Sequence, residues 1–192
     1  MKRSISSILL ALLLSFQAQA WSWTGDSQNE VRLGWGDPMF ETLAFHSGDG
    51  KTDYHYTGHF FAEYQRLITY KFSVGVKVDW ENVNWKYGSD KCNFYNLSIL
   101  PTARFTWFQR DWCSLHSSIG AGLNINGGTE VDYLGRKTVA APALDLCPVG
   151  FSVYKDRYFL SLELGGLSSL NNGQEIFMFF SRMISISAGI NF

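Results

Sequence analysis

The chain has 192 residues, with 16 basic and 17 acidic side chains and a formal charge of −1, which is enough for one domain. No basic cluster occurs in it, so a nucleic-acid-binding protein is excluded. Glycine is abundant at 18 residues, proline is scarce at 4, and aromatic residues make up 16%, a composition typical of strands and tight turns rather than helices.

Residues 1–20 have the pattern of a cleaved secretory signal peptide. Lys2 and Arg3 precede an apolar run from Ile8 to Leu14, and a small-x-small cleavage site follows at Ala18 to Ala20. The apolar run is shorter than the roughly 20 residues that a membrane-spanning helix needs, and no later run is longer, which excludes a helical membrane protein. We therefore expect export to the periplasm.

Polar, turn-rich segments divide the remainder of the chain into strands, and long and short segments alternate. The longer segments are residues 37–57, 88–94, 126–137 and 168–175, and the shorter ones are 67–71, 109–111 and 154–157. Seven connections join eight strands, and the number is even, as outer-membrane barrels require. The predicted fold is all-β: an eight-stranded antiparallel up-and-down transmembrane β-barrel over residues 29–192, with short periplasmic turns, longer extracellular loops and a periplasmic linker at 21–28.

The final strand shows the alternation that a barrel wall in lipid demands. Residues 184, 186, 188, 190 and 192 are apolar, while 185, 187, 189 and 191 are small or polar. The same alternation occurs at 73–80, 96–107, 115–125 and 160–165. In the sixth strand the apolar residues change parity near Pro148, which predicts a β-bulge there because a phase change needs one extra residue.

Aromatic residues are expected at both membrane interfaces. An outer girdle is predicted from Trp35 and Trp80, which would close the outer ends of the first and third strands. An inner girdle is predicted near the short turns and the C-terminus. Its members are Trp107, Trp112, Tyr154, Tyr158 and Phe192.

The inward face of an eight-stranded barrel is expected to be filled by side chains rather than to form a channel. Its parity collects charges of both signs, which we expect to pair with one another. They are Arg32, Glu63, Lys77, Asp79, Arg104, His116, Asp145 and Glu163. A gated polar pathway or proton relay through this network is the alternative.

The mature chain from Trp21 to Phe192 resembles small eight-stranded outer-membrane barrels of the OmpA or OmpX architecture. The resemblance covers the whole mature chain and rests on the pattern of strands, turns and terminal aromatic residue. The segments 32–37, 96–104 and 122–129 are similar to small barrels of Bacteroidota. This resemblance implies an integral outer-membrane location but no particular activity.

One short motif is similar to a catalytic pair. Barrel lipid A deacylases carry His-x-Ser on one strand, and His116 and Ser118 have that spacing. In those enzymes an asparagine follows the serine and the pair faces lipid, whereas here Ile119 follows and the pair has inward parity. The nearest downstream acid, Glu130, lies in a predicted outer loop. We therefore assign no catalytic residue and expect His116 to be a hydrogen-bonded lumen residue.

The first predicted outer loop is the best candidate contact surface, because it is long and rich in aromatic and titratable residues. Its candidate contact residues are His46, Asp49, Asp53, His55 and His59. These residue types bind Zn²⁺ or Cu²⁺ when they converge, but their spacing matches no closed metal motif, so no metal or cofactor is assigned. The three cysteines, Cys92, Cys113 and Cys147, allow at most one disulfide, and buried or lipid-facing thiols are favoured.

The predicted function is non-enzymatic: a barrel with a filled lumen that presents its loops for binding or for a structural role in the envelope. The alternatives are a lipid-modifying enzyme similar to lipid A deacylases and a transporter of small apolar molecules. Expected partners are outer-membrane lipid, the barrel-assembly machinery through the C-terminal strand ending at Phe192, and an extracellular ligand or protein. A soluble, lipocalin-like barrel is the structural rival, since periodicity alone does not say which face points inward.

Overall fold

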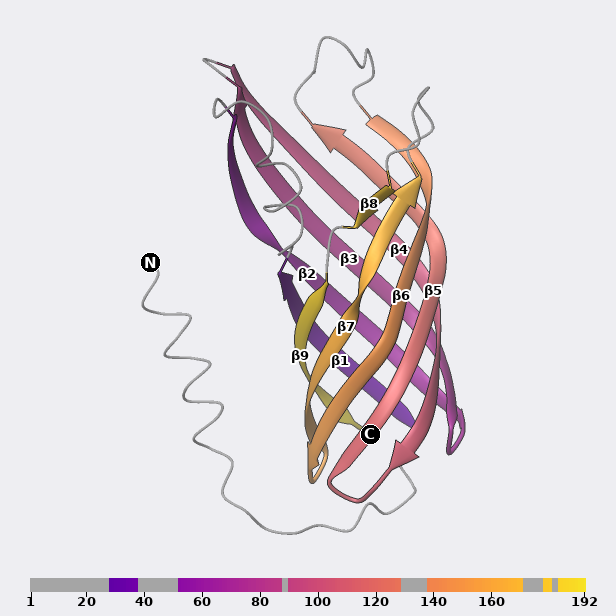
Figure 1. The fold of residues 1–192 in the computed structure, drawn as a ribbon. Helices are drawn as coiled ribbons and strands as arrows, with labels where there is room; N and C mark the ends of the chain where they lie inside the picture. Colours follow the sequence, from indigo (N-terminus) through magenta and orange to yellow (C-terminus); the bar gives the residue numbers. More distant parts are fainter. Residues whose placement is uncertain (1–27, 38–51, 88–89, 129–137, 171–177, 181–182) are drawn as a thin grey trace.

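The computed structural model describes residues 28–37, 52–87, 90–128, 138–170, 178–180 and 183–192. Every regular element in these ranges is a β-strand (Figure 1). None of the described residues belongs to a helix long and apolar enough to cross a membrane. The predicted signal peptide and residues 21–27 of the predicted linker lie outside the described residues.

The strands form one closed antiparallel sheet. Each of the first seven strands pairs with the next one along the chain, and the last segment, β9, pairs with both β7 and β1, which closes the barrel. The short segment β8 pairs with β7 beyond β9, so the two together form the eighth strand. The predicted eight-stranded up-and-down barrel is confirmed. The bounds are β1 (Asn29–Asp37), β2 (Thr52–Thr69), β3 (Phe72–Tyr87), β4 (Asp90–Gln109), β5 (Cys113–Gly128), β6 (Thr138–Lys155), β7 (Tyr158–Leu170), β8 (Met178–Phe180) and β9 (Ile184–Asn191).

The three predicted short turns lie together at one end of the barrel, at the bottom of Figure 1, which we call the turn end. They connect β2 to β3, β4 to β5 and β6 to β7. Asp156 in the last of them has a positive φ of 55°, a conformation that Asp tolerates better than most residues. The C-terminus lies at the same end, where the backbone N–H of Phe192 donates to the carbonyl oxygen of Asn29 at 2.9 Å.

The opposite end, the loop end, differs from the prediction, because paired strands continue into all four segments predicted as loops, and they continue furthest in β2 and β4. Strand β2 begins at Thr52, and β3 and β4 stay paired up to Tyr87 and Asp90. The pairing of β1 with β2 stops earlier, at Gly36 and His59. We call residues 52–58, 83–87 and 90–94 the β2–β4 extension. The polarity of residues 52–57 and 90–94 indicated loops, but outside lipid a strand needs no apolar face, and backbone hydrogen bonds form without one.

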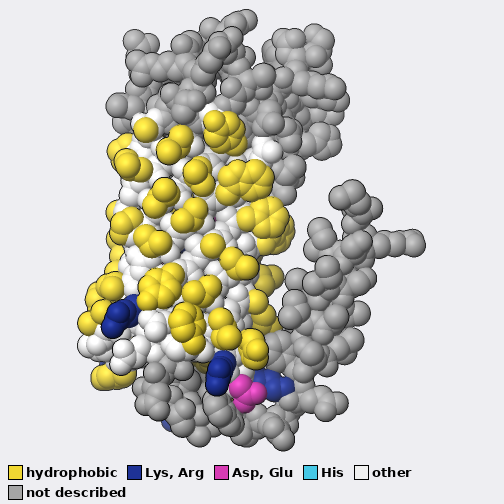
Figure 2. Space-filling model, turned by 180° about the vertical axis from the view of Figure 1, so that it is seen from behind, with side chains coloured by type: hydrophobic (Ala, Val, Ile, Leu, Met, Phe, Trp, Pro, Cys, Tyr) yellow, Lys and Arg dark blue, Asp and Glu magenta, His cyan; other side chains and the backbone are white. Residues whose placement is uncertain are grey.

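Apolar side chains cover the outer wall of the barrel and charged ones fill its interior. Figure 2 shows hydrophobic side chains over the wall and Lys and Arg side chains at the lower rim. Among the described side chains, all exposed charges lie beside the turn end: Arg66, Lys71, Arg110, Asp111, Asp156 and Arg157. Wall residues such as Leu33, Ile119 and Leu123 are at least half exposed. The predicted orientation is confirmed, and the lipocalin-like alternative is wrong because its apolar face would point inward.

Six of the seven predicted interface aromatics are exposed, and two predictions about them are corrected. The side chains of Trp35, Trp80, Trp107, Trp112, Tyr158 and Phe192 are all exposed on the outer face. Trp80 stacks on Phe60 with ring centroids 6.3 Å apart, but it does not close the third strand, because β3 continues to Tyr87.

Tyr154 was wrongly predicted as an interface aromatic. It faces inward, where its hydroxyl lies 2.9 Å from Ser114 Oγ. The physical reason is the alternation itself: Phe151 and Val153 point outward, so the next residue must point inward.

The predicted bulge in β6 is confirmed. The pairs His116–Gly150 and Ser118–Cys147 leave two residues of β6 opposite one residue of β5, and the β7 side shows the same shift. Pro148 and Val149 are both exposed in succession, whereas Cys147 and Gly150 on either side point inward. The bulge therefore changes which residues of β6 reach the lumen.

Glycines make room for aromatic rings inside the barrel. An added Cβ at Gly34 would lie 2.1 Å from the Phe61 ring, and one at Gly189 would lie 2.2 Å from the Phe159 ring. The Phe61 ring also lies under two cations, with Lys77 Nζ 4.3 Å and Arg32 Cζ 5.6 Å from its centroid. The missing side chain at Gly34 and the two cations together position the ring.

We expect Gly34→Ala to lower the free energy of unfolding by about 1–3 kcal/mol, because the new methyl group overlaps the Phe61 ring. The measurement is urea unfolding of the folded barrel in lipid vesicles. Ala62→Val, on the exposed face of the neighbouring strand, is the matched control and should change little. Equal stability of wild type and Gly34→Ala would contradict the packing described here.

Candidate functional site

The predicted charge network lies in the lumen as expected. Each of the strands β1 to β7 contributes at least one member, and none of the eight side chains is more than 6% exposed. Strand alternation directs these residues inward, and pairing with opposite charges reduces the penalty of taking them out of water. All eight predicted residues are buried inside the described barrel.

Arg32 is the centre of the network. Its Nε donates to Glu63 Oε2 at 2.7 Å, and Nη2 bonds the same carboxylate, so the guanidinium holds β2 to β1. Its Nη1 donates to Glu163 on β7. One buried side chain thus joins carboxylates from two other strands with the fork geometry that suits arginine.

The network continues toward the turn end through Arg104. Its Nη1 donates to Glu30 Oε1 at 2.6 Å, and its Nη2 lies 3.5 Å from Glu63 Oε1. Gln65 also donates to Glu63 at 2.5 Å and to Thr102 Oγ1 at 2.8 Å. Glu63 is therefore shared between the two arginines, and the chain of charges is continuous from Glu30 to Glu163.

Further pairs lie nearer the loop end. Lys77 Nζ on β3 donates to Asp145 Oδ2 on β6 at 2.7 Å. Asp79 pairs with the His59 ring, and Asn96 donates to Glu81 at 3.0 Å. The interior is consequently bonded across the barrel at several heights, which leaves little space for a continuous passage.

Four members of the network were missed or misplaced by the sequence. Glu30, Gln65 and Glu81 are buried and bonded but were not predicted. His59 was predicted in the outer contact loop, yet it is fully buried in β2 and paired with Asp79. Inward parity with Glu63 would have found His59, but the polar residues before it indicated a loop.

The structure describes no side chain for the other four candidate contact residues. His46 and Asp49 lie outside the described residues. Asp53 and His55 belong to the β2 part of the β2–β4 extension, where the structure describes the backbone only. The proposed contact surface therefore changes in one respect: His59 does not belong to it.

The buried charges of the described lumen do not balance. Six carboxylates, those of Glu30, Glu63, Asp79, Glu81, Asp145 and Glu163, face three basic side chains, Arg32, Lys77 and Arg104. Two buried histidines, His59 and His116, each contact a carboxylate. With neutral histidines the interior has a formal charge of −3, so it favours additional positive charge, whether protons or a bound cation.

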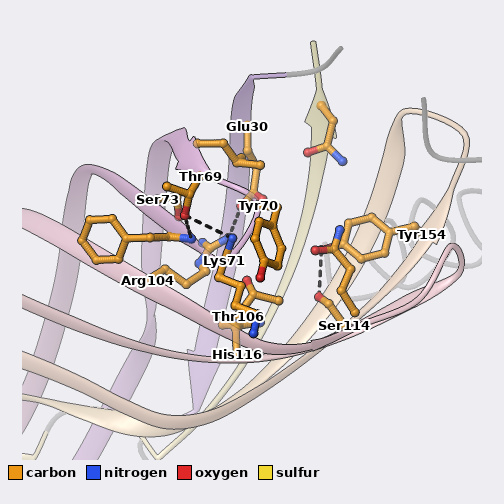
Figure 3. Close-up of a pocket in the computed structure, with 14 residues that line it drawn as sticks. Glu30, Thr69, Tyr70, Lys71, Ser73, Arg104, Thr106, Ser114, His116 and Tyr154 are labelled. Atoms are coloured by element: carbon orange, nitrogen blue, oxygen red, sulfur yellow. Dashed lines mark hydrogen bonds and ion pairs between the residues drawn. The ribbon is translucent and has the colours of Figure 1, made fainter. Parts of the chain in front are cut away.

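A small polar cavity opens into the lumen from the turn end (Figure 3). It has a volume of about 30 Å³, room for a water molecule or two. Lys71 and Tyr70 of the first turn lie at it, and His116 and Arg104 line it deeper inside. Ser114 and Tyr154 close another side through their hydrogen bond of 2.9 Å. The cavity connects this end of the barrel with the charge network.

The deacylase-like pair is arranged unlike a catalytic dyad. His116 Nε2 lies 3.0 Å from Glu163 Oε1, on the inner side of the wall and away from lipid. The other acid considered, Glu130, lies outside the described residues. An apolar depression of about 330 Å³ does lie on the outer wall beside Pro148, Ser117 and Ile119. In it Ser117 Oγ donates to the Pro148 carbonyl at 2.5 Å, and no described histidine lines it.

The two described cysteines are buried thiols. Cys113 and Cys147 are 3% and 2% exposed, and neither belongs to a disulfide. This agrees with the favoured interpretation. Cys147 faces inward, whereas Cys113 is buried although its cross-strand partner, Val153, lies on the outer face. Cys92 has no described side chain.

Comparison with known proteins gives likenesses of fold only. No protein-family model matches the chain, and no curated protein does. Among solved structures it is similar to the attachment invasion locus protein Ail of Yersinia pestis, with 11% identity, coverage of 86% of this chain and 99% of that one, and a TM-score of 0.45. Ail in complex with the heparin analogue sucrose octasulfate gives a TM-score of 0.49, again at 11% identity and with the same coverage. The outer membrane protein OprG of Pseudomonas aeruginosa gives 10% identity, coverage of 85% and 90%, and a TM-score of 0.41.

Proposed function

We propose that this protein is an integral outer-membrane barrel, inserted after export to the periplasm, and that it has no enzymatic activity. The observation that carries the proposal is the arrangement of charges: the described wall has an exposed charge only beside the turn end, while buried charges fill the interior. Such an outer surface is stable in hydrocarbon and would aggregate in water. The exposed aromatics at the two ends then serve as interface anchors.

The loop end is the functional end in this proposal. The turn end faces the periplasm, with the short turns and the terminus, and the β2–β4 extension rises outside the membrane. A rigid, paired ribbon of strands holds the connecting segments away from the lipid surface, where a ligand, a partner protein or another envelope component can reach them. His46, Asp49, Asp53 and His55 are the proposed contact residues.

The bonded lumen supports a binding or structural role over catalysis or transport. The inner face is occupied by the network around Arg32, and His116 is directed at Glu163 rather than at lipid. The partners we propose are outer-membrane lipid along the wall and the barrel-assembly machinery at β9 and the residue that follows it, Phe192, which is 54% exposed. The ligand at the loop end is left open.

The proposal is tested by membrane fractionation of cells that express the full chain. We expect the protein in the outer-membrane fraction, extractable only with detergent. With native Cys92 replaced by serine in every variant, a cysteine introduced at Asp53 should react with an impermeant maleimide on intact cells. A control cysteine at Asp156, in a periplasmic turn, should react only after lysis. Recovery in the soluble periplasmic fraction would overturn the proposal.

The enzymatic and transport alternatives have their own readouts. Mass spectra of lipid A from cells with and without the protein should be identical, and a loss of acyl chains would establish the deacylase alternative. Vesicles that contain the purified barrel should release small apolar solutes no faster than empty vesicles. Faster release that disappears when the loop end is blocked would establish transport.

A further inference from the structure

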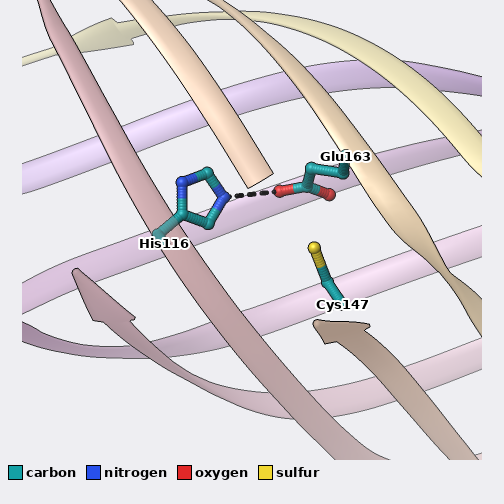
Figure 4. A group of neighbouring side chains, drawn as sticks. All are labelled: His116, Cys147 and Glu163. Carbon is teal, nitrogen blue, oxygen red and sulfur yellow. Dashed lines mark hydrogen bonds and ion pairs between the residues drawn. The ribbon is translucent and has the colours of Figure 1, made fainter. Parts of the chain in front are cut away.

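Three side chains of different chemistry converge in the lumen at the β6 bulge (Figure 4). They are His116 of β5, Cys147 of β6 and Glu163 of β7, and one ligand atom of each lies within 4.8 Å of the other two. All three are at most 2% exposed. We propose that this cluster is a zinc-binding site inside the barrel.

The backbone explains why the three residues meet. Gly150 lies opposite His116 on one side and opposite Glu163 on the other. A Cβ at Gly150 would lie 2.2 Å from His116 Nε2, so the imidazole crosses β6 through space that only glycine leaves. The bulge then turns Cys147 inward beside this ring, at a position that regular alternation from Gly150 would turn toward lipid.

The ligand set suits zinc. A thiolate, an imidazole and a carboxylate are common Zn²⁺ ligands, and a site with three protein ligands keeps a fourth position for water. Bond lengths of about 2.0–2.3 Å to tetrahedral zinc separate its ligand atoms by about 3.3–3.8 Å. Shifts of about an ångström in the positions of the three ligand atoms therefore bring the cluster to that geometry.

Two further observations point to a cation at this place. Glu163 uses Oε1 for both Arg32 and His116, and its Oε2, though buried, has no hydrogen-bond partner. A buried carboxylate oxygen without a partner is costly, and a metal ion would satisfy it. The formal charge of −3 in the described lumen also favours a divalent ion, although Arg32 lies nearby and limits how strongly it binds.

The ion has a route and a clear proton balance. His116 lines the cavity that opens at the turn end, so a zinc ion that has lost most of its bound water can approach the imidazole from that side. On binding, one Zn²⁺ enters and the Cys147 thiol releases its proton, as does the imidazole if it is protonated. No electron is transferred. The ion pairs that Arg32 makes with Glu63 and Glu163 need not break.

The test uses the full chain folded in detergent micelles and titrated with zinc chloride or cobalt chloride. We expect one ion per chain and, with cobalt, the near-ultraviolet thiolate-to-metal absorption and the visible bands of a tetrahedral site. Cys147→Ser should abolish the thiolate band and weaken zinc binding by about 100-fold or more. Cys113→Ser, the matched control at the other described buried cysteine, should leave both unchanged.

A measurement on the wild-type chain covers the case in which Cys147→Ser does not fold. Zinc should slow alkylation of Cys147, followed by mass spectrometry, and leave the rate at Cys113 unchanged. The proposal is overturned if the wild type binds no zinc, if cobalt gives no thiolate band, or if zinc fails to protect Cys147. Binding that survives Cys147→Ser and disappears in His46→Asn or His55→Asn would place the metal at the loop end instead and also overturn it.

Discussion

Arg32→Ala is expected to lower the free energy of unfolding of the barrel by about 3–5 kcal/mol, because it leaves Glu63 and Glu163 without their shared cation. Both carboxylates are at most 3% exposed, so water does not replace the guanidinium. The Phe61 ring also loses one of the two cations that hold it. Urea unfolding in lipid vesicles, followed by tryptophan fluorescence, measures the change.

Arg66→Ala is the matched control for this experiment. Arg66 is an exposed arginine near the turn end, and its removal should change stability by about 0.5 kcal/mol or less. A further variant, Arg32→Lys, keeps the charge but not the fork, and should recover only part of the loss. If Arg32→Ala were as stable as Arg66→Ala, the network would not contribute to the stability of the barrel in the way described here.

Val76→Arg is expected to destabilise the inserted barrel by about 2–4 kcal/mol, since Val76 lies on the lipid-facing wall. It is four residues from Phe72, which at about 3.3 Å per residue and a tilt of about 40° places it about 10 Å from the turn end, near the middle of the bilayer. The arginine would have to be dehydrated or reach to the headgroups. The measurement is the same unfolding experiment in vesicles.

The control for depth is Ile68→Arg, at an exposed position next to the first turn. There the guanidinium reaches headgroups and water, so the expected loss is only about 0–1 kcal/mol. A soluble barrel would tolerate both substitutions equally well. Equal stability of the two variants would therefore refute the orientation of the apolar wall toward lipid. Experiments on the lumen residues do not test that orientation.

Alternation along the chain was sufficient to predict which side chains lie in the lumen. It placed Arg32, Glu63 and Glu163 inside, because a strand in lipid has only two faces and one of them must be apolar. Alternation failed to predict the structure of the loop end, where a strand outside lipid needs no apolar face. His59 and the β2–β4 extension belong to a part of the chain where polar residues occur in loops and in strands alike.

The sequence by itself determined the barrel class, the number of strands, the three short turns, the bulge at Pro148 and the inward position of the charged residues. These depend on local period and turn chemistry, which are encoded in neighbouring residues. Only the tertiary structure decided which charges pair, that Arg32 joins Glu63 and Glu163, and that His116 and Cys147 meet at Glu163. Such contacts depend on strand register and on the closure of the sheet, which bring together residues far apart in the chain.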